Sequence, residues 1–576
     1  MWYLGIDFGT TNLRAVLLNA NTGETLPLYW LSDSQESAES KKALPSAAYS
    51  GPHPPQGSQL PLPPFVVGRE AIAFISQETG VFLEGFKPFL NLTIPYYCRD
   101  DHQWKPQLEV FETESVSLYW VQRAVQALFA TLTSNSDRPL KVGAVGCQEN
   151  VLREALERLE GVIVSCPAQW SDTYRFNLRE AILKANLVKH PQQIFFVEEA
   201  IASLLASLPM AEDADSSGTL TGGTLIIHGG ASTTELGLVN LPRNCKDLVN
   251  ADFCLRTFPY GGNALDQDIF CQLIYPQWSS VQSYSWNWET DVPQSGEPDS
   301  ERRDRLYSLL PRDSKGKSPL NVARLVKLIL QQREEFTAQL GQLSWGVKRL
   351  DFQEKVVRPL IQNLNQQLNE MLSETGFPEQ EMNQVILSGG TTLTLWPDLK
   401  QWLEKKFPEI KVIKAAGEEH CDRIAFGLVH LPFYPMVLNR KRQQYDDYFL
   451  FSEFLQMFPH KPVTLSEMMM LLERRGINTR ACEDRIKGFL QGKLPSGLVP
   501  NPSALLSQSF QENLDYQSLN AIALFSEESN QYYRPNIEQF QRLHRYWNRL
   551  FAGTIQAFDE PLAGNLTVGD RFSNNT

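Results

Sequence analysis

Two segments of the chain, far apart in sequence, carry the same run of small and polar residues between apolar ones. The first reads LGIDFGTTNLRAVLLN (4–19) and the second reads LIIHGGASTTELGLVN (225–240), an offset of 221 residues. Glycine lets the backbone bend where a side chain would obstruct it, and the Thr, Ser and Asn residues that follow present N–H groups and hydroxyls to an anion. Two such bends facing each other could bind a polyphosphate, although each alone could be an ordinary turn with glycine at positive φ.

Each segment reads as an apolar strand, a tight turn and a second apolar strand, so each bend must lie at the tip of a hairpin. Because the whole pattern recurs, we expect two homologous halves, each contributing one phosphate-binding bend. Neither bend has the Gly-x-x-x-x-Gly-Lys-Ser/Thr pattern of the Walker loop, which leads into a helix. The expected ligand is therefore bound by hairpin tips.

Between these hairpins and beyond the second one, apolar runs alternate with amphipathic segments, a pattern typical of α/β proteins. We expect strands at 162–167, 193–198 and 385–390, helices at 113–132, 172–185 and 200–208, a helix-rich stretch at 321–375, and polar insertions at 32–64 and 276–319. After residue 430 the pattern changes to short helices, expected at 448–457, 465–475, 480–491 and 537–552. The predicted division is thus a first half (1–208), a second half (209–430) and a helical C-terminal domain (431–576).

Composition excludes several classes of function. The 576 residues carry a net charge of −13, which argues against a general binder of nucleic acid or of anionic membranes. The eight cysteines are dispersed without a C-x-x-C pair, so neither a zinc site nor a disulfide framework is indicated. The N-terminus does not resemble a signal peptide, and no apolar run approaches 18 residues, so we expect a cytoplasmic protein.

GIDFGTTN (5–12) resembles the phosphate-binding segment of the heat shock protein 70 family, within the actin-like ATPase superfamily. Four further segments resemble motifs of that family in the same order: VIVSCPAQWSDTYR (162–175), VEEAIASLLA (197–206), YGGNALD (260–266) and VILSGGTT (385–392). The resemblance covers about residues 1–430. It implies a duplicated actin-like (ribonuclease H-like) ATPase domain of two lobes, here followed by a mainly α-helical C-terminal domain instead of a peptide-binding module.

The resemblance also implies roles for individual residues, with ATP or ADP and Mg²⁺ as cofactors. Asp7 and Glu235 would lie near the magnesium ion, and Lys87, Glu199 and Thr233 would be catalytic. The residues implied in nucleotide binding are Gly9, Thr10, Thr11, Asn12, Gly229, Gly230, Ala231, Ser232, Gly261, Gly262, Arg333, Gly389, Gly390 and Thr391.

The second hairpin departs from the family pattern at one position that matters. The family has an aspartate where this chain has His228, and an imidazole does not attract hydrated Mg²⁺ as a carboxylate does. At the adenine, the family's arginine is replaced by Leu393, and Arg333 is the best candidate for a cation on that side. These changes favour ATP binding over efficient hydrolysis.

Two functions remain open on the sequence. The first is a slow, chaperone-like ATPase in which nucleotide-driven lobe closure acts on a protein partner bound through residues 431–576. The second is a scaffold that binds ATP without turnover and recruits a partner. A filament-forming actin relative is less favoured, and a sugar kinase would need a hydroxyl-binding acid in the cleft that the sequence does not reveal. We expect neither nucleic acid nor a membrane as a partner.

Overall fold

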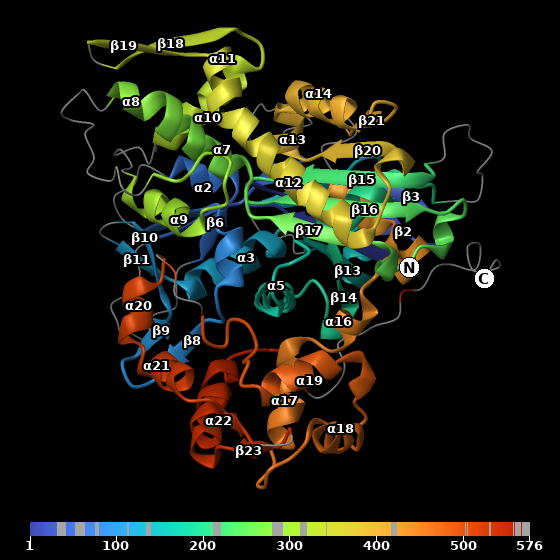
Figure 1. The fold of residues 1–576 in the computed structure, drawn as a ribbon, viewed down its shortest axis with the longest axis vertical. Helices are drawn as coiled ribbons and strands as arrows, with labels where there is room; N and C mark the ends of the chain where they lie inside the picture. The colour runs from blue at the N-terminus through green and yellow to red at the C-terminus, as the bar shows by residue number, and fades with distance from the viewer. Residues whose placement is uncertain are drawn as a thin grey trace.

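In the computed structural model, the chain forms two mixed β-sheets with covering helices and a helix-rich C-terminal region, coloured orange and red in Figure 1. The chain is therefore an α/β protein. The structure describes residues 1–31, 42–51, 64–74, 80–111, 114–133, 140–210, 220–278, 292–310, 319–340, 342–415, 423–500, 503, 505–528, 531–556, 558 and 566.

The first sheet is built from the N-terminal third of the chain. Its strands lie in the order β12 (Lys141–Ala144), β3 (Glu24–Leu31), β2 (Asn12–Asn19), β1 (Trp2–Phe8), β13 (Leu159–Cys166) and β14 (Ile194–Glu198), with β4 (Leu44–Pro45) beside β2. β1, β13 and β14 run parallel, whereas β1, β2, β3 and β12 pair antiparallel. The central strands β1 and β13 are mainly apolar and buried because both faces of the sheet are covered.

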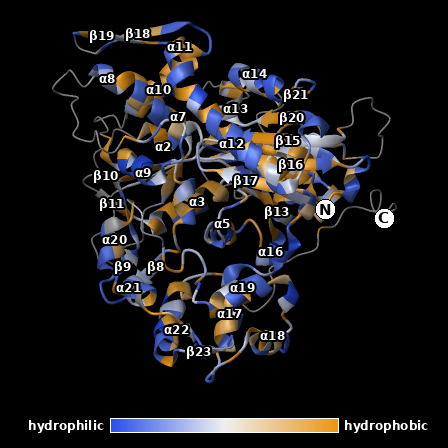
Figure 2. Cartoon of the chain, viewed as in Figure 1, coloured by the Kyte–Doolittle hydropathy of each residue, from blue (hydrophilic) through white to orange (hydrophobic). Residues whose placement is uncertain are grey.

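The second sheet has the order β17 (Cys254–Phe258), β16 (Thr234–Leu241), β15 (Gly222–Gly229), β20 (Met382–Ser388) and β21 (Lys411–Lys414). β15, β20 and β21 run parallel, and β15, β16 and β17 pair antiparallel. Figure 2 shows that its central strands are mainly hydrophobic, while α12 in front of them is largely hydrophilic. This sheet is therefore a buried layer.

The repeated sequence segments form hairpins with the same register. In β1–β2, Leu4 lies opposite Leu17 and Asp7 lies opposite Arg14. In β15–β16, Leu225 lies opposite Leu238 and His228 lies opposite Glu235. Since each pair differs from its counterpart by the sequence offset of 221, the repeat predicted from the residues is also a repeat in strand pairing.

Two helices pack between the sheets. α6 (Glu199–Leu205) and α15 (Arg423–Val429) share a core with apolar residues of β1, β13 and β15. They approach so closely that a Cβ on Gly427 would lie 1.7 Å from the carbonyl oxygen of Ala202. A glycine at this position is therefore required by packing.

The outer face of each sheet has its own helices. α3 (Leu118–Ala130), α4 (Glu149–Glu157) and α5 (Asp172–Lys184) contribute to the core of the first sheet. α7 (Gly262–Ile269), α10 (Pro319–Leu330), α12 (Arg358–Thr375) and α14 (Trp396–Lys406) contribute to the core of the second. The other helices before residue 430 are α2 (Arg69–Ala73), α8 (Tyr275–Trp278), α9 (Ser300–Leu309), α11 (Arg349–Phe352) and α13 (Gly390–Thr394).

Short strands form small separate sheets. They are β5 (Ala47–Ser50) with β6 (Phe65–Val67) and β7 (Val81–Glu84), β8 (Tyr96–Cys98) with β9 (Gln103–Lys105), β10 (Gln107–Phe111) with β11 (Glu114–Ser117), and β18 (Glu335–Leu340) with β19 (Leu343–Lys348). Most of the insertion expected at 32–64 lies outside the described residues. In the insertion expected at 276–319, residues 292–310 are described and include α9, whereas 279–291 and 311–318 lie outside.

Two helical predictions are wrong in part. The helix expected at 113–132 begins only at Leu118, because 114–117 pairs with β10 and Ser117 caps the helix by accepting from the N–H of Tyr119. The helix-rich stretch expected at 321–375 is interrupted by the hairpin β18–β19, in which the rings of Phe336 and Trp345 pack 5.3 Å apart. In LSWGVK (343–348) apolar residues alternate with small or polar ones, which favours a strand over a helix.

The C-terminal region is mainly helical. Its elements are α16 (Arg440–Gln444), α17 (Asp447–Gln456), α18 (Leu465–Glu473), α19 (Glu483–Leu490), α20 (Ser507–Glu512), α21 (Leu514–Ala521), α22 (Ile537–Phe551) and the strand pair β22 (Phe525–Glu527) and β23 (Tyr533–Pro535). Its core includes Tyr96 of β8 and Phe176 of α5, so this region packs on the first half. Among the described residues, no helix combines the length and apolarity that crossing a membrane requires.

Candidate functional site

The tips of the two repeated hairpins lie side by side and both line a cavity of about 640 Å³. Fifteen of the residues to which the resemblance gives a metal, catalytic or nucleotide-binding role line it: Asp7, Gly9, Thr10, Thr11, Asn12, Lys87, Glu199, Gly230, Ala231, Ser232, Thr233, Gly262, Gly389, Gly390 and Thr391. Gly229 and Gly261 lie directly behind this wall, where a Cβ on Gly261 would lie 2.6 Å from the carbonyl carbon of Ala231. The structure thus gathers residues that span almost 400 positions of sequence.

The two bends have the same geometry and touch each other. The N–H of Gly9 donates to the carbonyl of Asn12 at 2.9 Å, and the N–H of Gly230 donates to the carbonyl of Thr233 at 2.8 Å. The hydroxyls of Thr10 and Ser232 lie 2.7 Å apart. The two turns therefore form one continuous wall that includes hydroxyl-bearing residues, a surface suited to an anion with several oxygens.

A third segment closes the opposite side of the second bend. Gly389, at the end of β20, has φ 86°, and a Cβ there would lie 2.3 Å from the carbonyl oxygen of Gly229. The hydroxyl of Thr391 donates to the carbonyl of Gly230 at 2.7 Å. Only glycine combines this positive φ with such a close backbone approach, which explains the glycine at position 389, directly before α13.

Lys87 and Glu199 form a buried ion pair in the wall of the cavity. Lys87 Nζ lies 2.6 Å from Glu199 Oε1, and each side chain is about 5% exposed. Burial would lower the pKa of Lys87, but the charge of Glu199 raises it above its ordinary value. Burial would raise the pKa of Glu199, but Lys87 lowers it. Both groups are therefore charged, and a phosphate would compete with Glu199 for the ammonium.

His228 occupies the wall beside this pair. Its Nδ1 lies 3.0 Å from the hydroxyl of Ser388, and its Nε2 lies 3.8 Å from Glu199 Oε2. Burial lowers the pKa of His228, so the imidazole is neutral at neutral pH. Asp7, also in the wall, accepts a hydrogen bond from the Ser165 hydroxyl at 3.2 Å, and burial raises its pKa.

Glu235, expected near a metal ion, is not among the residues that line the cavity. Its carboxylate is turned away and accepts hydrogen bonds from the backbone N–H groups of Ala168 and, at 2.9 Å, Ala200. Burial and the nearby charge of Glu199 raise the pKa of Glu235 to about 8. Because Ala168 and Ala200 belong to the first half, Glu235 acts as a link between the two sheets.

The structure also does not bring Arg333 to the cavity. α10 ends at Leu330, and Arg333 lies exposed in the turn that leads to β18. Arg324 and Lys327, about two turns nearer the start of α10, line the cavity instead, and both bind Asp266, at 3.1 and 2.6 Å. The sequence signal that could have found them is their spacing of three on an amphipathic helix, which places both on one face.

The charges around the cavity favour an anion. Its lining contains Arg14, Lys87, Arg324, Lys327 and Arg423, against the acids Asp7, Glu199 and Asp266. Five cations and three carboxylates leave an excess of positive charge in a wall that is largely buried. No cluster of three or more potential metal-ligating His, Cys, Asp or Glu side chains occurs among the described residues.

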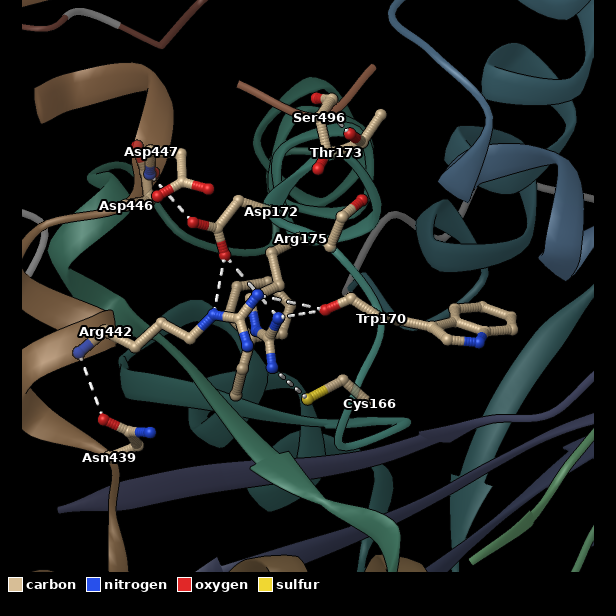
Figure 3. Close-up of polar contacts among 12 residues, drawn as sticks. Cys166, Trp170, Asp172, Thr173, Arg175, Asn439, Arg442, Asp446, Asp447 and Ser496 are labelled. Carbon is tan, nitrogen blue, oxygen red and sulfur yellow. Dashed lines mark hydrogen bonds and ion pairs between the residues drawn. The ribbon is translucent and has the colours of Figure 1, made fainter. Parts of the chain in front are cut away.

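Trp170 connects this cavity to the C-terminal region. Its ring lies in the wall, with Lys87 Nζ 5.7 Å from the ring centre. Figure 3 shows its carbonyl accepting from Arg175, at 2.8 Å, and the structure also gives a hydrogen bond from Arg442 Nη2 at 3.1 Å. Arg442 comes from α16, so one short segment contacts both the cavity and the C-terminal helices.

Asp172 strengthens the same junction. It is almost fully buried and accepts from Arg442 Nε at 3.0 Å and from the N–H of Asp447 at 2.8 Å (Figure 3). Burial would raise the pKa of Asp172, but Arg442 and Arg175 lower it. A charged carboxylate at the start of α5 therefore binds the C-terminal region to the first half.

No protein-family model matches this chain, and no curated protein sequence is significantly similar to it. Function must therefore be inferred from the cavity itself. Its main features are two bends of equivalent geometry, an excess of cations, a buried lysine–glutamate pair and a neutral histidine.

Proposed function

We propose that the protein binds ATP and ADP in the cavity lined by both hairpin tips, with an actin-like fold related to that of the heat shock protein 70 family. The observation that carries this proposal is the contact of the two equivalent bends through Thr10 and Ser232. Each bend supplies N–H and hydroxyl donors, and the surrounding cations supply charge neutralisation. A triphosphate needs both, since its oxygens are numerous and negatively charged.

The adenosine would lie toward Gly389, Gly390 and Thr391. This end of the cavity is bordered by the apolar side chains of Leu393 and Ile424 and by Arg423. An apolar surface beside a cation suits a flat aromatic base attached to a polar sugar.

A magnesium ion would arrive with the phosphates. Asp7 is the carboxylate of the wall best suited to it, because Glu199 and Asp266 are bound to cations. Mg²⁺ keeps several waters and requires few protein oxygens, so Asp7 alone fits a loosely held ion. When bound, the ion would neutralise charge on the phosphate oxygens.

Hydrolysis in this arrangement would be slow. Lys87 is positioned to neutralise a terminal phosphate, and Glu199 would orient a water once Lys87 is drawn away. His228 and the outward orientation of Glu235 leave the second hairpin without a carboxylate in the cavity. That observation favours the second candidate, a protein that binds ATP with no turnover and signals its presence.

In both candidates the output would pass to the C-terminal region and a protein partner bound there. The segment at Trp170 contacts Lys87 in the cavity and Arg442 in α16. A shift of the lysine toward a phosphate would therefore alter the contacts of Trp170 with α16. Nucleotide-dependent movement of residues 431–576 is the expected consequence.

Direct titration with ATP and ADP tests the proposal. A Cβ on Gly390 would meet no atom within 4 Å, so Gly390→Trp places a large ring in the cavity with little disturbance of the wall. We expect this variant to lose nucleotide binding and to keep its melting temperature. Gly553→Trp, at a glycine with the same open surroundings outside the cavity, is the matched control. Absence of affinity in the unmodified protein would contradict the proposal.

A further inference from the structure

A second cavity, of about 430 Å³, adjoins the first on the other side of the hairpin tips. Thr10, Thr11, Ser232 and Thr233 line both cavities. The phosphate-binding bends therefore form a thin partition, with one cavity on each side.

The walls of the second cavity are mainly apolar and come from three parts of the chain. Phe89 and Leu92 belong to the first half, Tyr307 and Leu320 to the second, and Leu505 to the C-terminal region. A concave apolar site with a few polar groups at the junction of several units is the usual form of a small-molecule site.

The polar groups of this wall are mostly engaged within the protein. Arg303 binds Asp268 at 2.9 Å, and Arg324 binds Asp266 at 3.1 Å. The side chain of Gln267 donates to the carbonyl of Arg303 at 3.0 Å. These groups shape the cavity, and few of their hydrogen-bonding positions remain for a ligand.

Asp304 differs from them. It lies on α9 in the wall of the cavity, and its carboxylate has no hydrogen-bond or ion-pair partner among the described residues. Asp304 is partly exposed at the edge of this wall, and the partial burial of its unpaired carboxylate raises its pKa to about 7. A ligand that donates a hydrogen bond would offset the cost of this burial.

We propose that the second cavity binds a small, mainly apolar molecule through one hydrogen-bond donor, a hydroxyl or an ammonium, that pairs with Asp304. The apolar body would contact Phe89, Leu92 and Leu320, and the donor would lie toward α9. Binding of this ligand does not require nucleotide. Because both cavities share the Thr10–Ser232 partition, we also expect this ligand to change the affinity for nucleotide, and that expectation rests on the proposed function.

The probe is a panel of small aryl and alicyclic compounds, each tested as the primary alcohol, the primary amine and the parent hydrocarbon. Binding of each compound to the full chain is measured by ligand-observed NMR. The two polar arms distinguish a hydroxyl from an ammonium, and the hydrocarbons report the apolar contribution. We expect at least one alcohol or amine to bind more tightly than its hydrocarbon, and Asp304→Asn to weaken that compound about tenfold.

Two pairs of variants separate binding from misfolding. Glu301→Gln removes an exposed carboxylate from the same helix and should bind the compound as the unmodified protein does. Ile72→Trp blocks the cavity from a residue that is 43% exposed, whereas Leu325→Trp places the same ring at a position 50% exposed outside both cavities. We expect binding to be lost only in Ile72→Trp, with melting temperatures unchanged.

The proposal is overturned if no alcohol or amine of the panel binds at millimolar concentration, or if Asp304→Asn and Ile72→Trp bind like their controls. ATP titration of the same samples keeps the two proposals distinguishable. Nucleotide binding without any ligand in the second cavity would remove only this inference, whereas ligand binding without nucleotide binding would remove only the proposed function.

Discussion

The ammonium of Lys87 lies 2.6 Å from Glu199 Oε1, in a wall where each side chain is about 5% exposed. Such a pair offsets the desolvation of both charges only while both partners remain. The same two residues are the groups that a bound triphosphate would rearrange. The pair therefore has a structural role without ligand and, in the proposed function, a chemical role with it.

Replacing one member of this pair should destabilise the protein. Lys87→Met leaves Glu199 buried without its cation, and we expect a loss of about 3–5 kcal/mol in the free energy of unfolding, measured by denaturant titration. The double variant Lys87→Met with Glu199→Gln should recover much of that loss, because no unpaired charge remains. Equal stability of the single and double variants would contradict a buried pair.

The histidine in the second hairpin should limit turnover. His228→Asp adds a carboxylate beside Asp7 in the cavity wall, which should raise affinity for Mg²⁺ and increase Mg²⁺-dependent phosphate release at least about tenfold. His228→Asn, which removes the imidazole without adding charge, serves as the control and should show no gain. If both variants release phosphate at the same rate, His228 does not limit hydrolysis.

Glu235 should make stability depend on pH. Its pKa is raised from 4.5 to about 8 in the folded protein, so the folded state holds a proton there that the unfolded state releases. Stability contributed by this group is complete below pH 4.5 and declines as pH rises toward 8, by at most about 1.4 kcal/mol per pH unit. Unfolding measured across this range should show a smaller decline in Glu235→Gln than in the unmodified protein. An unchanged slope would mean that Glu235 titrates near its ordinary value.

The sequence predicted the hairpins well because their signal is local. The apolar strands and glycine bends around Gly9 and Gly230 are readable from neighbouring residues, and the repeat predicted that both bends would share one geometry. The end of α10 was harder to predict. Arg333 follows an apolar run with helical spacing, but the helix ends at Leu330 and the chain then enters the β18–β19 hairpin.

Long-range packing explains what the sequence could not reveal. Glu235 turns from the cavity because N–H groups of Ala168 and Ala200 are available to it, and neither donor is near in sequence. The second cavity is assembled from three regions, and Asp304 lies in a polar stretch that offers no motif. Sites of this kind become visible only once the chain is folded.

The junction at Arg442 should hold the C-terminal region against the first half. Arg442→Ala removes hydrogen bonds to Asp172 and to the carbonyl of Trp170, and hydrogen bonds to a buried charged group each contribute about 1.5–3 kcal/mol. We expect proteolysis between residues 440 and 500 to accelerate, with little change in ATP affinity. Arg440→Ala, at an exposed position of the same helix, should leave the cleavage rate unchanged.

If ATP alters the cleavage rate in the unmodified protein but not in Arg442→Ala, the segment at Trp170 transmits the state of the cavity to α16. Equal responses in both proteins would mean that the C-terminal region senses nucleotide through another contact.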